Sequence, residues 1–279
     1  MMMQRWPWRG SRWGVALLVV LFGCTAPTLD SDPTATRENA LPVATQLTGG
    51  PSTDQFAELS PDGALIVFVS DRNGTPQLWM MPVQGGIPSP LTPAHDFLIS
   101  PVWSPDGSRL AYVSDQGEST TVWVVLADGG EPVQVTSGSG IVADPQWSPG
   151  GTTILYSRNT EGETDLWSVV VDDGVSTRLT RHGTVSRGRW SPDGSRIAFL
   201  SDRGGTRSIF VASLADGDLR QVTNDEGDES SVEWSPDGEL FVFTSNRAGN
   251  PDVWTVPVEG GSPTPLTSGA GNDTQPQWS

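Results

Sequence analysis

The chain of 279 residues contains no lysine, one cysteine and only two histidines. All 16 basic residues are therefore arginines, and with 33 aspartates and glutamates the formal net charge is −17. Nucleic acids are bound through basic side chains that release counterions from the phosphates, so we expect no nucleic-acid partner. A single cysteine excludes an intramolecular disulfide. A zinc or iron site needs three or four converging ligands, which two histidines supply poorly.

Few residues are suited to catalysis. His95 and His182 lie in the same kind of loop, two repeats apart, and we interpret both as solvated loop residues. No Gly-x-Ser-x-Gly elbow occurs, so the residues shown encode no serine hydrolase of that type. The sequence therefore predicts a protein that is not an enzyme and that holds no cofactor or metal.

Long hydrophobic runs are also lacking, apart from nine apolar residues from Gly14 to Phe22. This run is shorter than the roughly 20 residues that span a bilayer, and three arginines precede it, as in a secretory signal peptide over 1–23. The string Leu21-Phe22-Gly23-Cys24 resembles the bacterial lipobox, which implies that Cys24 is the lipid-attachment residue. The alternative is an inert thiol in a leader that is cut away.

Residues 24–43 are rich in threonine, proline, alanine and aspartate and show no periodicity. This composition is typical of a flexible tether between a lipid and a folded domain. Two or more acyl chains on one cysteine would anchor a protein stably, whereas a single chain is marginal. We expect an extracytoplasmic protein, lipid-anchored to a bacterial membrane on its periplasmic side or at the cell surface.

What the chain has in abundance is glycine (32), proline (23) and tryptophan (12), and these recur in register. The tetrad Ser-Pro-Asp-Gly, or a near copy, repeats every 43 or 44 residues. It starts at Ser60, Ser104, Ser148, Ser191 and Ser235. The residues preceding these serines and the final serine are Leu59, Trp103, Trp147, Trp190, Trp234 and Trp278. A second aromatic column consists of Trp79, Trp123, Trp167, Phe210 and Trp254, and a third column ends each unit with Leu/Val-Thr.

Each unit reads as four short strands. The tetrad predicts a tight turn, because proline presets φ at its second position and glycine tolerates positive φ at its fourth. Apolar runs such as 65–69 and 197–200 follow it, and consecutive apolar positions indicate strands that are buried on both faces. Four antiparallel strands per unit, packed face to face around an axis, describe an all-β fold, the β-propeller, with tryptophans between its blades.

Five repeats are complete over the predicted propeller domain, 44–279, and a sixth is partial. The extra Leu47-Thr48 resembles the end of an outermost strand, and 274–278 resembles an innermost strand. Together they would give two strands of a sixth blade. We therefore expect a six-bladed ring and a sequence truncated at its C-terminus. The alternative is that five blades close alone, with both ends of the chain frayed.

The repeated Trp-Ser-Pro-Asp-Gly, followed by an Ile-Ala-Phe-type strand and Ser-Asp-Arg-x-Gly, resembles the TolB-type propeller repeat over roughly 44–279. The resemblance implies a six-bladed propeller in the cell envelope. It is a likeness to the repeat family and not to TolB itself, because TolB carries an α/β domain ahead of its propeller and is not a lipoprotein.

Two sets of charged residues are candidates for binding a partner. The Ser-Asp-Arg loops and their variant supply Arg72, Arg203 and Arg247, although their recurrence in register favours a structural role. The single asymmetric feature is an acidic loop with Asp225, Glu226, Asp228 and Glu229. It could receive a basic partner or hold Ca²⁺, but its spacing matches no calcium-loop motif, and charge runs are usually solvated surface. In a propeller it lies on the same face as the Ser-Asp-Arg loops.

These observations predict a membrane-tethered, non-enzymatic propeller that binds a protein partner, with specificity set by its loops. A first alternative is the N-terminal propeller of a prolyl-oligopeptidase-type serine peptidase, whose hydrolase domain would follow Ser279. A second alternative is a propeller that binds a carbohydrate or another metabolite.

Overall fold

The computed structural model describes residues 45–116, 119–181, 183–224 and 226–278. Over this part of the chain the only regular elements are 20 β-strands, arranged in five antiparallel sheets of four. We call these sheets blades 1 to 5 in chain order, and within each blade the strands follow one another in sequence. No helix within the described residues is long and apolar enough to cross a membrane. The predicted all-β propeller of four-stranded blades is confirmed.

Each blade consists of three longer strands and a short outer one. Blade 1 contains β1 (Asp54–Leu59), β2 (Leu65–Ser70), β3 (Gln77–Pro82) and β4 (Ser89–Pro90). Blade 2 contains β5 (Leu98–Trp103), β6 (Arg109–Gln116), β7 (Ser119–Leu126) and β8 (Val133–Gln134). Blade 3 contains β9 (Ile141–Trp147), β10 (Thr153–Thr160), β11 (Glu163–Val170) and β12 (Ser176–Arg178). Blade 4 contains β13 (Val185–Trp190), β14 (Arg196–Ser201), β15 (Ser208–Ser213) and β16 (Leu219–Gln221). Blade 5 contains β17 (Glu229–Trp234), β18 (Leu240–Ser245), β19 (Asp252–Pro257) and β20 (Thr264–Pro265).

The Ser-Pro-Asp-Gly tetrad joins the first strand of a blade to the second through a fixed hydrogen-bond set. In blade 2 the buried Ser104 hydroxyl donates to Asp106 Oδ1 at 2.6 Å and accepts the Arg109 N–H at 2.9 Å. Hydrogen bonds from Ser104 and Ser108 lower the pKa of the Asp106 carboxyl to about 2. Blade 3 has Gly150 where the other four blades have aspartate, so its turn lacks this acceptor.

The tryptophan before each tetrad ties its blade to the preceding one. The indole N–H groups of Trp103, Trp147, Trp190 and Trp234 donate to backbone carbonyls in the first strand of the preceding blade, over 3.2 to 3.4 Å. Apolar side chains of both blades fill the rest of each interface, as between blades 4 and 5, where Leu200 and Val211 meet Val232 and Phe243. The predicted position of these tryptophans between blades is confirmed.

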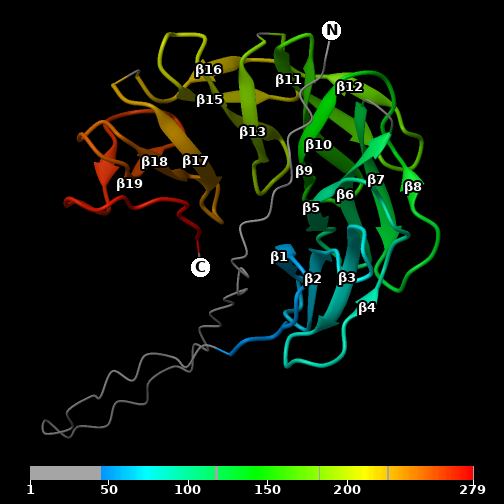
Figure 1. The fold of residues 1–279 in the computed structure, drawn as a ribbon. Helices are drawn as coiled ribbons and strands as arrows, with labels where there is room; N and C mark the ends of the chain where they lie inside the picture. Colours follow the sequence, from blue (N-terminus) through cyan, green and yellow to red (C-terminus); the bar gives the residue numbers. More distant parts are fainter. Residues whose placement is uncertain (1–44, 117–118, 182, 225, 279) are drawn as a thin grey trace, which may run out of the picture.

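The five blades form an open arc, with blue blade 1 and orange-red blade 5 at its ends (Figure 1). Strands of consecutive blades contact each other, whereas within the described residues no strand of blade 5 contacts a strand of blade 1. Five blades therefore do not close alone in this structure. Residues 45–53 and 266–278 form no strand. Leu47 nevertheless packs against the apolar cluster of blade 1 that contains Ile66 and Phe68.

A backbone feature recurs in the first strand of every blade and precedes the tetrad by four residues. One non-glycine residue there adopts a left-handed conformation, with φ between 52° and 59°. These residues are Phe56, Ser100, Asp144, Arg187 and Ser231. Each lies where the pairing register with the second strand shifts, as at a β-bulge. A bulge bends the strand and redirects a side chain.

Candidate functional site

The loops between the second and third strands and those that enter the first strands lie on one face of the arc, which we call the loop face. In blade 1 this face is organised by Arg72. Its guanidinium carbon lies 5.0 Å from the ring centre of Phe68 and 4.8 Å from that of Trp79. Its Nη2 also binds Asp54 Oδ1 at 2.9 Å. Such stacking suits a planar guanidinium better than an ammonium group, which agrees with a chain that uses only arginine.

Blade 5 repeats the arrangement with a more deeply buried ion pair. The Arg247 guanidinium lies over Phe243 and Trp254, at 5.5 and 5.3 Å from the ring centres. Its Nη2 binds Glu229 Oε1 at 2.6 Å, and the Glu229 side chain has no exposed surface. Burial raises the pKa of Glu229 to about 7, against the opposing effect of Arg247. The side chains of Arg247 and Glu229 are therefore too buried to contact a partner directly.

Arginines occupy the corresponding place in two further blades. Arg158 lies over Tyr156 and Trp167 in blade 3, and Arg203 lies 5.4 Å from the ring centre of Phe210 in blade 4. Arg203 is exposed, unlike Arg247. An arginine stacked on the second aromatic column is therefore a property of the repeat, which agrees with the structural role that its recurrence favours.

Blade 2 carries no arginine in its 2–3 loop, and His95 takes that place. Its ring contacts Tyr112 and Trp123 edge to face, at centroid separations of 5.8 and 6.2 Å. Its Nδ1 lies 2.8 Å from Ser114 Oγ. Burial lowers the pKa of His95. The interpretation of His95 as a solvated loop residue is therefore wrong, because the ring packs where other blades place a guanidinium; His182 lies outside the described residues.

The acidic loop reaches the first strand of blade 5 on the loop face. Glu226 and Asp228 are exposed, and a Glu226 carboxylate oxygen lies 3.8 Å from Arg247 Nη1. Asp228 is held at both ends: Oδ1 accepts the Arg207 N–H at 3.1 Å, and its own N–H donates to Asn246 at 2.8 Å. The predicted position of this loop on the same face as the Ser-Asp-Arg-type loop is confirmed by its contacts with Asn246 and Arg247. Asp225 lies outside the described residues.

The acidic loop packs closely on the blade because it contains Gly227. A Cβ atom at this buried position would lie 2.8 Å from the Arg247 nitrogen and 2.9 Å from Ser245 Oγ. Within the described ranges no group of three or more His, Cys, Asp or Glu side chains is placed to hold a metal ion. The exposed carboxylates of Glu226 and Asp228 form an anionic surface on a loop that packs tightly against blade 5. Cys24, the predicted lipid-attachment residue, also lies outside the described residues.

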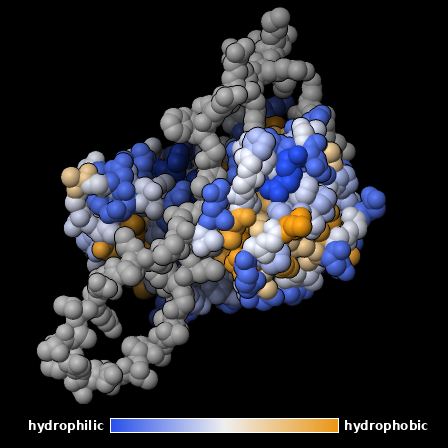
Figure 2. Space-filling model, turned by 60° about the horizontal axis from the view of Figure 1, so that its bottom comes forward, coloured by the Kyte–Doolittle hydropathy of each residue, from blue (hydrophilic) through white to orange (hydrophobic). Residues whose placement is uncertain are grey.

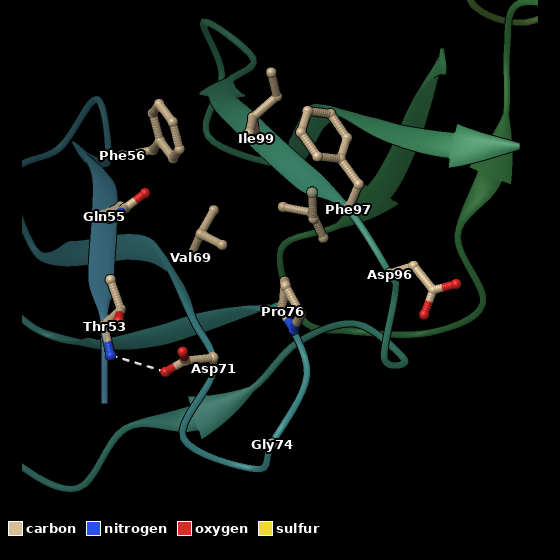
Figure 3. A pocket seen from close by; sticks show the side chains of 11 residues that line it. Thr53, Gln55, Phe56, Val69, Asp71, Gly74, Pro76, Asp96, Phe97 and Ile99 are labelled. Carbon is tan, nitrogen blue, oxygen red and sulfur yellow. Dashed lines mark hydrogen bonds between the residues drawn. The ribbon is translucent and has the colours of Figure 1, made fainter. Parts of the chain in front are cut away.

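A hollow on the loop face between blades 1 and 2 was not predicted from the sequence. It encloses about 260 Å³. Phe56, Val69, Phe97 and Ile99 converge on it, with Asp96 at one side (Figure 3). The signal in the sequence was weak: Phe56 and Phe97 are single departures from columns that are otherwise small, polar or aliphatic.

Comparison with known proteins gives a consistent result. The family described as the TolB beta propeller domain matches residues 87–223 and 181–279. Among solved structures, a protein of Agrobacterium tumefaciens assigned as TolB is 23% identical, with a TM-score of 0.64, over 81% of this chain and 84% of its own. TolB of Acinetobacter baumannii is 23% identical, with a TM-score of 0.62, over 76% of this chain and 55% of its own.

Part of a peptidase shows the same fold. The puromycin-hydrolyzing peptidase of Mycobacterium tuberculosis is 19% identical, with a TM-score of 0.66, over 81% of this chain and 40% of its own. The chain thus spans about half of the Acinetobacter TolB and less than half of the peptidase. Likenesses at these identities establish the fold alone.

Proposed function

We propose, on the premise that this chain belongs to the TolB β-propeller domain family, that it is a membrane-tethered, extracytoplasmic module that binds a protein partner and catalyses no reaction. The observation that carries the proposal is the loop face beside blade 5. Glu226 and Asp228 expose their carboxylates there, on a loop that Gly227 holds tightly to the blade. A fixed anionic surface favours a partner with a basic surface.

Two arginines of the loop face support this choice of surface. Arg72 and Arg247 stack on aromatic rings and bind acids of their own blades, so they hold the loops in shape. Binding at the acidic loop would then need little rearrangement, which lowers the cost of ordering side chains on association. The tether rests on the signal-peptide pattern and on Cys24, which lie ahead of the propeller in the sequence.

Site-specific photo-crosslinking in cells tests the binding surface. A photoreactive amino acid at position 226 should give a discrete protein adduct. The matched control is position 62, an exposed aspartate in the tetrad turn on the opposite face, and it should give none. Equal adducts from both positions, or none from position 226, would contradict the proposed surface.

Membrane fractionation tests the tether separately. Cys24→Ser should release the protein from the membrane fraction, because the thioether that would hold the lipid cannot form. An unchanged distribution between the membrane and soluble fractions would refute lipid attachment at Cys24.

A second candidate function is the propeller part of a serine peptidase. It is favoured by the similarity to the puromycin-hydrolyzing peptidase, of which this chain spans 40%. Sequencing the gene beyond the codon for Ser279 separates the two candidates. About 250 further residues with a Gly-x-Ser-x-Gly elbow would support the peptidase. A stop codon soon after a completed sixth repeat would support the binding module.

A further inference from the structure

We propose that the hollow between blades 1 and 2 is a socket for one aromatic side chain of a partner polypeptide, and that this side chain is flanked by arginine or lysine. This inference rests on the proposed protein-binding function and gives it a second contact point. It concerns a different pair of blades from the acidic loop, so the two surfaces can be tested independently.

The walls of the socket are mostly apolar and are supplied by both blades. Phe56 and Val69 come from blade 1, and Phe97 and Ile99 come from blade 2 or the loop before it (Figure 3). Both phenylalanines are exposed, at 46% and 39%. Orange apolar patches interrupt the mostly hydrophilic surface in Figure 2. Exposed aromatic rings that converge on a hollow are typical of a binding surface rather than of a packed core.

The backbone holds Phe56 in an unusual conformation. Its φ of 52° is in the left-handed region, which bulky residues seldom occupy. The same conformation recurs in the other blades, where the residues are serine, aspartate or arginine and none is aromatic. The repeat therefore explains the bulge but not the phenyl ring, and the bulge is what directs this ring toward the hollow.

The size of the hollow indicates its occupant. About 260 Å³ is less than the roughly 300–1,000 Å³ of pockets that bury drug-sized ligands. A single large side chain is a better match. Aromatic rings pair favourably with one another edge to face or offset, so walls that contain two phenyl rings favour an aromatic guest.

The charge around the hollow indicates the neighbours of that guest. Two carboxylates, Asp71 and Asp96, are among the lining residues, and none of the lining residues is basic. Asp71 is fixed by accepting the Thr53 N–H at 2.8 Å, and Asp96 is exposed. The basic residue next to Asp71 in the sequence, Arg72, is bound to Asp54 and stacked on Trp79 of its own blade, so it does not neutralise the hollow. An arginine or lysine beside the aromatic side chain would place a positive charge near these two carboxylates and so favour binding.

Calorimetric titration of the full chain with short peptides tests the socket. The probe is a capped Gly-Arg-Phe-Arg-Gly peptide, and the comparison peptides are Gly-Arg-Ala-Arg-Gly and Gly-Glu-Phe-Glu-Gly. We expect saturable binding of the first peptide alone. Phe56→Ala should weaken that binding at least about tenfold, as for an interface anchor. Ile87→Ala, at a 93% exposed position in blade 1, should leave it unchanged.

Further variants keep the test decisive. Phe97→Ala should reproduce the loss from the other wall, and unchanged near-ultraviolet circular dichroism would show that each variant is folded. Asp96→Asn should weaken binding about threefold or more at low salt, and Asp128→Asn, at an exposed turn in blade 2, should not. Equal affinity for Phe56→Ala and Ile87→Ala, or equal binding of all three peptides, would overturn the socket. An adduct from position 226 would still support the acidic loop in that case, so the two proposals fail separately.

Discussion

Replacing Arg247 with methionine should destabilise the protein by an amount that depends strongly on pH. The substitution keeps an apolar side chain over Phe243 and Trp254 but removes the positive charge that binds Glu229. Because Glu229 has no exposed surface, its carboxylate would then be buried without a counter-charge.

The magnitude follows from the burial of the pair. Removing one partner of a buried ion pair costs about 3–5 kcal/mol when the other partner stays charged. Once the carboxyl is protonated, what remains is the lost stacking of the guanidinium, about 0.5–2 kcal/mol. In the parent protein burial raises the pKa of Glu229 from 4.5 to about 7, and Arg247 opposes this rise. Without Arg247 the pKa rises further, so the buried carboxyl takes up a proton at pH 8 instead of staying charged. The extra loss at pH 8 is therefore the cost of protonating a group with a pKa of about 7, roughly 1.4 kcal/mol.

The same pKa difference sets the pH dependence of the parent protein. A raised pKa means that the folded state holds the proton more tightly than the unfolded state. The contribution of Glu229 is therefore fully present below pH 4.5 and is lost as the pH rises through 7. A pKa difference of this size corresponds to about 3 kcal/mol.

Urea unfolding followed by tryptophan fluorescence at pH 5 and pH 8 measures these effects. Arg247→Met should lower the free energy of unfolding by about 0.5–2 kcal/mol at pH 5 and by roughly 1.4 kcal/mol more at pH 8, where the parent carboxyl is ionised and that of the variant is not. Glu229→Gln should flatten the loss of stability between pH 4.5 and 7. Arg187→Met, at an exposed position, should cost less than about 0.5 kcal/mol at either pH. An equal loss for Arg247→Met at both pH values would refute the assignment of Glu229 as its buried partner.

Three further predictions concern the turns and the packing of the blades, and each is checked by the free energy of unfolding in urea. Gly150→Asp should stabilise blade 3 by about 1 kcal/mol, since it restores the missing turn acceptor at a position with open space; Gly151→Asp, at φ 68°, should instead destabilise. Ser191→Ala should cost about 1–2 kcal/mol, because the buried hydroxyl donates to the turn aspartate and accepts a backbone N–H at 2.9 Å; a comparable loss for the exposed Ser195→Ala would contradict this reasoning. Gly188→Ala should cost about 1–3 kcal/mol, because its Cβ would lie 2.7 and 2.9 Å from two leucine methyls of blade 3, and no loss would show that the blades can separate slightly.

The repeat itself was predictable because it depends on local chemistry and on side-chain size. The tetrad fixes a turn through the φ preferences of proline and glycine, and Trp147 or Trp234 fills an interface wherever two sheets pack. These properties follow from residue type and register alone. The blade architecture could therefore be inferred without coordinates.

The finer features of the loop face could not be predicted in the same way. The stacking of Arg72 on Trp79 joins residues seven positions apart across a hairpin, and its distance depends on the loop path. His95, which takes the place of an arginine in blade 2, comes from the loop before the first strand and not from the loop between the second and third strands. The left-handed residue has no sequence preference, since Phe56 and Arg187 adopt the same backbone. Asparagine, aspartate and histidine are the non-glycine residues that favour this conformation, and only Asp144 of the five is one of them, so propensity does not mark the column.

The uniform bulge has a consequence for how such proteins diversify. Its geometry is the same whether the residue is Phe56, Ser100, Asp144 or Arg187, so the frame does not depend on what that residue carries. A change of this one residue in each blade can then alter the chemistry of the first strand while the hydrogen bonds of the sheet stay intact. New binding specificities could therefore be introduced at these bulge positions first, because a substitution in one blade leaves the backbone of the other blades unchanged.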